Sequence, residues 1–158
     1  MIPDDQARFL NGPVIGFLGT RNRQLRPGVS WASAVRADAT GDIVSFLLPE
    51  NESARVKSDM EDNGHVALTV LDPVSHESYQ FKGTYLSSRP GNEHDRTLIE
   101  IQVAKVAARL NEMYTHGELF RRFMFWPGTV ISFRVEDIFI QTPGPQAGKR
   151  IEFRAASS

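Results

Sequence analysis

Hydrophobic and polar residues alternate along most of this chain with the two-residue period of a β-strand, and one long segment follows the period of a helix instead. Alternating or short apolar runs predict six or seven strands, at residues 14–21, 29–37, 43–48, 66–71, 79–86 and 129–141, with a short edge strand at 151–153. Apolar residues that recur at spacings of three and four predict a long helix beginning at about residue 92. These residues are Ile99, Val103, Val106, Leu110 and Met113. Shorter helices are expected at residues 4–10 and 53–63, with another turn or two at 118–125.

This succession of elements predicts an α+β protein in which a small antiparallel barrel, closed or half closed, is interrupted by one long helix. Turn residues 39–42 join strands 29–37 and 43–48 into a hairpin. Strand 29–37 has one face that we expect to carry its alternate residues Val29, Trp31, Ser33 and Val35. No linker or repeat divides the sequence, so residues 1–158 are expected to form a single domain.

Composition excludes several classes of protein. The chain has 158 residues and a formal net charge of -1, which gives no basic excess for binding nucleic acid or an anionic membrane. It contains no cysteine, which excludes disulfides, thiolate catalysis and cysteine-ligated metal sites. No apolar run approaches the roughly 20 residues of a membrane span, and the acidic first residues are unlike a signal peptide. We therefore expect a soluble, cytoplasmic protein.

The junction between strand 43–48 and the following helix carries chemistry suited to a phosphate group. Ser53, Arg55 and Lys57 bring a hydroxyl and two cations to a first helical turn, where backbone N–H groups have no partner inside the helix. The alternative interpretation is an ordinary solvated helix end, in which Glu50 and Glu52 balance the two cations.

Strand 29–37 also has a composition that admits a flat ligand. Small residues on both faces flank the large ring of Trp31, leaving room for a planar molecule or, alternatively, for a neighbouring helix. Common catalytic motifs are missing: the sequence has no nucleophile elbow, no P-loop and no dinucleotide-binding glycine pattern. The four histidines are not spaced as metal ligands would be: His65, His76, His94 and His116.

The order of these elements resembles the FMN-binding split barrels related to pyridoxamine 5'-phosphate oxidase. The resemblance runs from Val14 to about Gln141. It rests on the hairpin formed by 29–37 and 43–48, the helix entry Ser53-Ala54-Arg55, the return Asn63-Gly64-His65-Val66-Ala67-Leu68, and the strand Tyr79-Gln80-Phe81-Lys82-Gly83. Gln141-Thr142-Pro143-Gly144-Pro145 is similar to the ending of an uncharacterised branch of that family. The fold implied is a six- to seven-stranded antiparallel split β-barrel with one long helix and two short ones.

This resemblance implies a homodimer that binds FMN at the interface between its subunits. The FMN phosphate would be held at Ser53 and Arg55, with Lys57 nearby. Residues from two strands would line the flavin ring: Trp31, Ala32, Ser33, Ala34, Phe46 and Leu47. Gln80 would reach the ring from the second subunit. The residues near Trp31 and Phe46-Leu47 depart from those of pyridoxamine 5'-phosphate oxidase itself, so the substrate is left open.

The function implied is an FMN-dependent oxidoreductase, in which the cofactor carries the electron chemistry and the protein positions it. The alternatives are a non-catalytic module that binds or senses flavin, a deazaflavin or haem on the same barrel, and a structural dimer without a ligand. The aromatic residues Phe123, Phe125 and Trp126 are expected to be exposed at the dimer interface.

Overall fold

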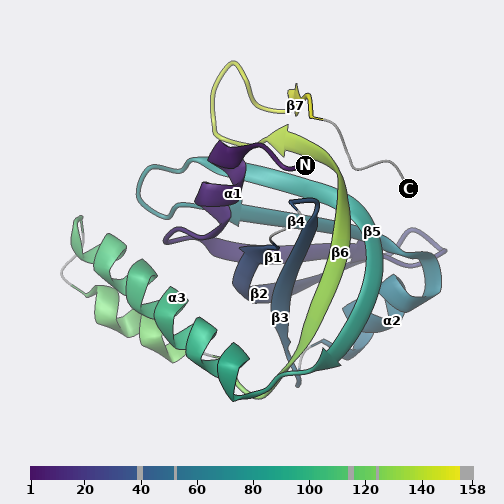
Figure 1. Cartoon of the computed structure of the whole chain (residues 1–158), viewed down its shortest axis with the longest axis horizontal. Helices are drawn as coiled ribbons and strands as arrows, with labels where there is room; N and C mark the ends of the chain where they lie inside the picture. Colours follow the sequence, from purple (N-terminus) through teal and green to yellow (C-terminus); the bar gives the residue numbers. More distant parts are fainter. Residues whose placement is uncertain (39–40, 52, 114–115, 124, 154–158) are drawn as a thin grey trace.

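Seven antiparallel strands form one sheet that closes on itself, with helices outside it (Figure 1). The computed structural model describes residues 1–38, 41–51, 53–113, 116–123 and 125–153. The elements are α1 (Asp4–Leu10), β1 (Ile15–Arg21), β2 (Pro27–Ala37), β3 (Ile43–Pro49), α2 (Ala54–Asn63), β4 (His65–Leu71), β5 (Ser78–Pro90), α3 (Glu93–Asn111), η1 (Gly117–Phe123), β6 (Gly128–Ile140) and β7 (Arg150–Ile151). Residues 39–40 of the predicted turn lie outside the described set.

Pairing between β3 and β6 closes the barrel. The strand order is β3-β2-β1-β4-β5-β6-β7, and the additional β3–β6 ladder joins the first strand of that order to the sixth. The interior holds large side chains from facing strands that are fully buried, among them Phe46, Phe81 and Phe133. Ile2 and Leu10 from the amino-terminal segment join the same core. The prediction of a split barrel in an α+β protein is therefore confirmed.

A bulge in β2 changes the face on which its later residues lie. Ser33 pairs with Leu47, but the next pair is Arg36 with Ser45, so two residues of β2 stand opposite one residue of β3. Ala34 adopts a left-handed backbone with φ 49° at this point. Val35 consequently points into the barrel core. The prediction that Val35 shares a face with Trp31 was wrong, because an inserted residue reverses the alternation.

The long helix α3 packs on the outside of the barrel. Ile99 and Val103, two members of its predicted apolar stripe, form a second buried cluster that includes Ala34 and Val130 of the sheet. The helix ends at Asn111, and Met113 of the predicted stripe is 61% exposed beyond it. The 3-10 helix η1 runs back alongside α3 (Figure 1).

A buried carboxylate fastens the beginning of α3 to the sheet. Asp95 and Asn92 form a capping box at this helix start. Asp95 is 0% exposed and accepts hydrogen bonds from Arg89 at 2.6 and 3.0 Å and from Arg36 at 3.2 Å. Arg36 belongs to β2 and Arg89 to β5, so one carboxylate connects α3 to two strands.

Replacement of Asp95 by Asn is expected to lower the free energy of unfolding by roughly 3 kcal/mol, because two arginines lose their common counter-charge. The pKa of Asp95 is lowered, mainly by its hydrogen bonds from Arg89. Its contribution is therefore complete above the unfolded carboxyl pKa of about 3.9 and is lost as the pH falls through the lower folded pKa. Urea unfolding at pH 7 and pH 3 measures both effects.

The matched control is Glu93→Gln in the same helical turn, because the Glu93 side chain is 85% exposed. We expect this variant to unfold within about 0.5 kcal/mol of the parent protein. Equal losses for the two variants would show that the buried ion cluster does not fasten α3.

Candidate active site

The start of α2 offers unpaired polar groups next to positive charge. Ser53 is the N-cap residue, is 4% exposed, and its hydroxyl donates to the carbonyl oxygen of Glu50 at 3.5 Å. Its side chain caps no amide, and the first helical turn holds no acidic residue. Within the part of the chain that the structure describes, nothing accepts a hydrogen bond from the amides of Ala54 and Arg55. These amides can therefore bind an anion.

Two cationic side chains flank these amides. Arg55 is exposed and Lys57 is half-buried. Neither side chain forms a hydrogen bond or an ion pair with any described residue, so Glu50 does not neutralise them. Glu52, the other acid considered from the sequence, lies outside the described residues. Cations at a helix start oppose its dipole by about 0.3 to 1 kcal/mol each, and a bound anion removes that conflict.

The other side of α2 is fixed against the barrel. Val56 and Met60 are 2% and 0% exposed and belong to the main core. The hydroxyl of Thr20 in β1 donates to the buried carboxylate of Asp59 at 2.9 Å. Gly28 of β2 lies directly beneath α2. It leaves no room for a side chain, since a Cβ there would come within 2.7 Å of the Thr20 hydroxyl. This packing holds the cationic turn in a fixed place at the barrel wall.

Four of the residues predicted to line a flavin ring are buried by the protein itself. Ala32 and Phe46 point into the barrel core and are 3% and 0% exposed. Ala34 and Leu47 belong to the cluster outside the barrel and are covered by α3. These four residues are buried on the two faces of β2 and β3, and they present no open surface on which a flavin ring could lie.

Trp31 and Ser33 remain on the outer face of β2, and η1 partly covers them. The ring of Trp31 lies 4.8 Å from that of Phe17, 5.3 Å from Phe123 and 5.8 Å from Phe125, measured between centroids. A cavity of only about 20 Å³ is left beside Trp31 and Ser33. The small residues of β2 thus accommodate helical segments, which was the alternative considered from the sequence. Phe123 is still 42% exposed, so the aromatic cluster is only partly covered.

Gln80 lies on the same outer face as Trp31 but three strands away across the sheet. The register places Trp31 opposite Phe17, Phe17 opposite Thr69, and Thr69 opposite Gln80. The Gln80 amide donates to the Thr69 hydroxyl at 3.1 Å. Three strand spacings separate Gln80 from Trp31, or about 14 Å. A ring beside Trp31 would therefore be out of reach of Gln80 in the same chain.

A shallow groove of about 460 Å³ lies on this outer face and was not anticipated from the sequence. Gly19 and Ala67 form its floor, and Val29, which pairs with Gly19, is 73% exposed beside it. Charged residues of both signs line the groove: Arg21, Lys82, Glu136 and Asp137. The signal in the sequence was the small size of Gly19 and Ala67, which alternation alone does not distinguish from core positions.

Comparison with known proteins identifies the fold. Neither the models of protein families nor the sequences of curated proteins match this chain. Among solved structures, HupZ of Group A Streptococcus is 19% identical with a TM-score of 0.56, covering 94% of this chain and 100% of that one. An FMN-binding protein from Syntrophomonas wolfei subsp. wolfei is 13% identical with a TM-score of 0.54, covering 86% and 84%. A proposed pyridoxamine 5'-phosphate oxidase from Lactobacillus delbrueckii is 15% identical with a TM-score of 0.52, covering 87% and 93%.

The chain therefore has the split-barrel fold of FMN-binding and pyridoxamine 5'-phosphate oxidase-related proteins. Among the described residues, no three histidine, aspartate or glutamate side chains come together as metal ligands. None of the helices formed by those residues has the length and apolar character needed to cross a membrane.

Replacement of Phe123 by Ala is expected to increase the exposure of Trp31, because Phe123 covers one flank of its ring. The measurement is acrylamide quenching of tryptophan fluorescence in a Trp126→Phe background, which leaves Trp31 as the only fluorescent tryptophan. Leu119→Ala, on the same 3-10 helix and 52% exposed, should leave the quenching unchanged. Unchanged quenching in the Phe123 variant would mean that η1 does not cover this face.

Proposed function

We propose that this chain is an FMN-dependent oxidoreductase that holds the phosphate of its cofactor at the start of α2. The observation that carries the proposal is a cationic helix start that has free amides, no acidic residue in its first turn and no partner for its cations among the described residues. The fold supports it, because solved structures with this architecture include an FMN-binding protein.

The residues of this turn fit a phosphate in several respects. The amides of Ala54 and Arg55 would donate hydrogen bonds to its oxygens, and the Ser53 hydroxyl would add a third donor. Arg55 and Lys57 would supply charge-assisted hydrogen bonds to an ionised group. The packing of α2 on the barrel means that this site is preorganised.

The flavin ring would lie against the uncovered flank of Trp31 and Phe123. Ser33 would form the edge of this surface, whereas Ala32, Ala34, Phe46 and Leu47 would hold the strands in shape beneath it. When bound, flavin supplies hydride and single-electron transfer, and the protein contributes an apolar wall that positions it and excludes water.

A second copy of the chain would complete the site. Gln80 lies too far from Trp31 to reach the same ring, so it would contact a flavin held by the partner subunit. The groove over Gly19 and Ala67 fits a two-fold interface, since its small residues permit close approach and its rim carries both signs of charge. The exposed side chain of Val29 would be buried there.

Replacement of Arg55 by Ala is expected to weaken FMN binding roughly tenfold to a hundredfold, because a charge-assisted hydrogen bond contributes about 1.5 to 3 kcal/mol. Quenching of FMN fluorescence on titration with the protein measures the affinity. Arg96→Ala is the matched control, an exposed arginine in the first turns of α3 that pairs with Glu93 and Glu100. The phosphate assignment fails if the two variants bind FMN equally well.

Turnover distinguishes an oxidoreductase from a non-catalytic flavin-binding or sensing module. Anaerobic addition of NADH or NADPH to the FMN-loaded protein is expected to bleach the flavin absorption band, and admission of air should restore it. A band that persists with both donors would favour the binding module over the enzyme.

Replacement of Ala67 by Arg is expected to separate the two copies, because it places a charge on the floor of the groove. Light scattering should give twice the 17.7 kDa chain mass for the parent protein and the single mass for the variant. Ala108→Arg, an exposed alanine on α3, should leave the mass unchanged. A parent protein that is monomeric at micromolar concentration would refute the proposed interface.

A further inference from the structure

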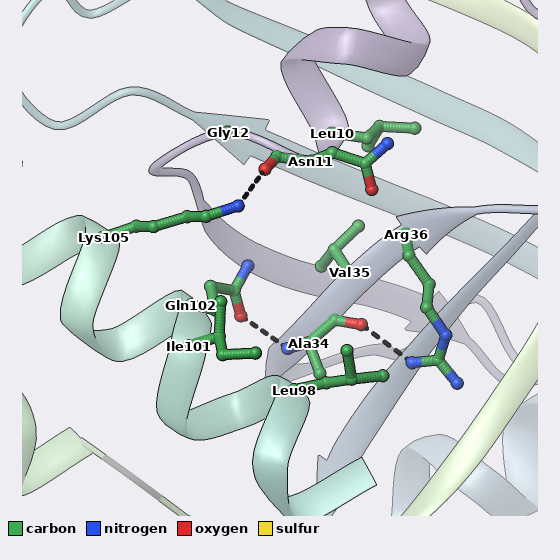
Figure 2. A pocket seen from close by; sticks show the side chains of 10 residues that line it. All are labelled: Leu10, Asn11, Gly12, Ala34, Val35, Arg36, Leu98, Ile101, Gln102 and Lys105. Carbon is green, nitrogen blue, oxygen red and sulfur yellow. Dashed lines mark hydrogen bonds between the residues drawn. The ribbon is translucent and has the colours of Figure 1, made fainter. Parts of the chain in front are cut away.

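A second cavity, separate from α2, lies between α3, the bulge of β2 and the loop that follows α1 (Figure 2). Its volume is about 150 Å³. Cavities of this size in other proteins hold molecules as large as benzene. Neither the residues proposed to bind the FMN phosphate nor Trp31 and Phe123 line it, so its ligand would occupy a different place from the proposed flavin.

Two cations line this cavity from opposite sides, and none of the described residues that line it is acidic (Figure 2). Lys105 on α3 uses one of its three N–H donors, to the backbone oxygen of Asn11 at 2.9 Å. Arg36 on β2 donates to the backbone oxygen of Ala34 at 3.1 Å and to Asp95. Both side chains keep spare donors. The cavity therefore has an excess of hydrogen-bond donors with positive charge.

The positive charge near Arg36 is incompletely balanced. Asp95 is its carboxylate partner, and Arg89 shares the same carboxylate through two hydrogen bonds. Burial lowers the pKa of Arg36, and the nearby charge of Arg89 lowers it further, while Asp95 raises it. Desolvated, partly compensated positive charge is the environment in which an additional anion is stabilised.

The remaining walls are mainly apolar. Leu98 and Ile101 contribute aliphatic side chains from α3, and Leu10 and Val35, whose side chains pack in the barrel core, also border the cavity. The amide of Gln102 is already used at both ends, accepting from the Ala34 amide and donating to the Val14 oxygen at 3.2 Å. Gln102 thus closes the side of the cavity toward the barrel.

We infer that this cavity binds a small amphipathic monocarboxylate, with its carboxylate at Lys105 and its apolar body against Leu98 and Ile101. Arg36 would add attraction from the far side without giving up its bond to Asp95. Inorganic phosphate has the charge but no apolar body to bury, and a neutral molecule of the same size would leave the cations uncompensated. The cavity therefore favours a ligand that has both a carboxylate and an apolar body.

Benzoate is a suitable probe, because it joins a ring of benzene size to one carboxylate. We expect saturable shifts in the ¹H–¹⁵N spectrum of the labelled protein at Ala34, Asn11 and the side-chain amide of Gln102. Lys105→Gln should weaken benzoate binding about tenfold. Benzyl alcohol and inorganic phosphate should each bind at least about tenfold more weakly than benzoate does to the parent protein.

Lys149→Gln is the matched control, an exposed lysine outside the cavity that should leave the affinity unchanged. Ile101→Phe, which fills the cavity, should abolish the shifts and serves as a second test should Lys105→Gln unfold. Equal binding of benzoate and benzyl alcohol, phosphate binding as tight as that of benzoate, equal losses in the two lysine variants, or no saturable shift at the cavity would each overturn the inference.

Discussion

Closure of the barrel by the β3–β6 ladder determines where every functional feature of this molecule lies. The ladder runs from Ile43 opposite Arg134 to Pro49 opposite Gly128. It requires a residue without a side chain at Gly128, where a Cβ would lie 2.4 Å from the backbone oxygen of Leu48. β3 ends where this ladder ends, so the helix that follows it, α2, begins beside the ladder. The position of the cationic turn at Arg55 therefore depends on backbone pairing between β3 and β6.

The outer wall of the barrel divides into three surfaces. The bulge at Ala34 provides a place where α3 packs closely, and its free amide is satisfied by Gln102. Phe123 at the end of η1 and Phe125 just after it cover β2 as far as Trp31. Beyond that point none of the described helices covers the wall, from Val29 across the groove to Gln80. Helical cover on one part of the wall thus leaves a neighbouring part exposed, and this is where we propose that a second copy and the cofactor bind.

The sequence predicted the elements well where their signals are local. Alternation located the strands, and apolar spacings of three and four located α3 from about residue 92. The bulge at Ala34 was missed because its left-handed backbone occurs at an alanine, where no glycine announces it. The cover of Trp31 by Phe123 was missed because it joins segments about ninety residues apart. For the candidate site, the local sequence brings Ser53, Arg55 and Lys57 together at one helix start, and their role in binding stays a prediction. The exposure of the predicted ring-lining residues depended on tertiary packing that pattern does not encode.

The central claim, that the free amides at the start of α2 bind the phosphate of FMN, is tested most directly by nuclear magnetic resonance. The amide protons of Ala54 and Arg55 are predicted to move downfield when the labelled protein is saturated with FMN, because each gains a charge-assisted hydrogen bond. Riboflavin, which has the same ring but no phosphate, is predicted to leave them in place. Equal shifts with both compounds, or no shift with FMN at these two amides, would contradict the account.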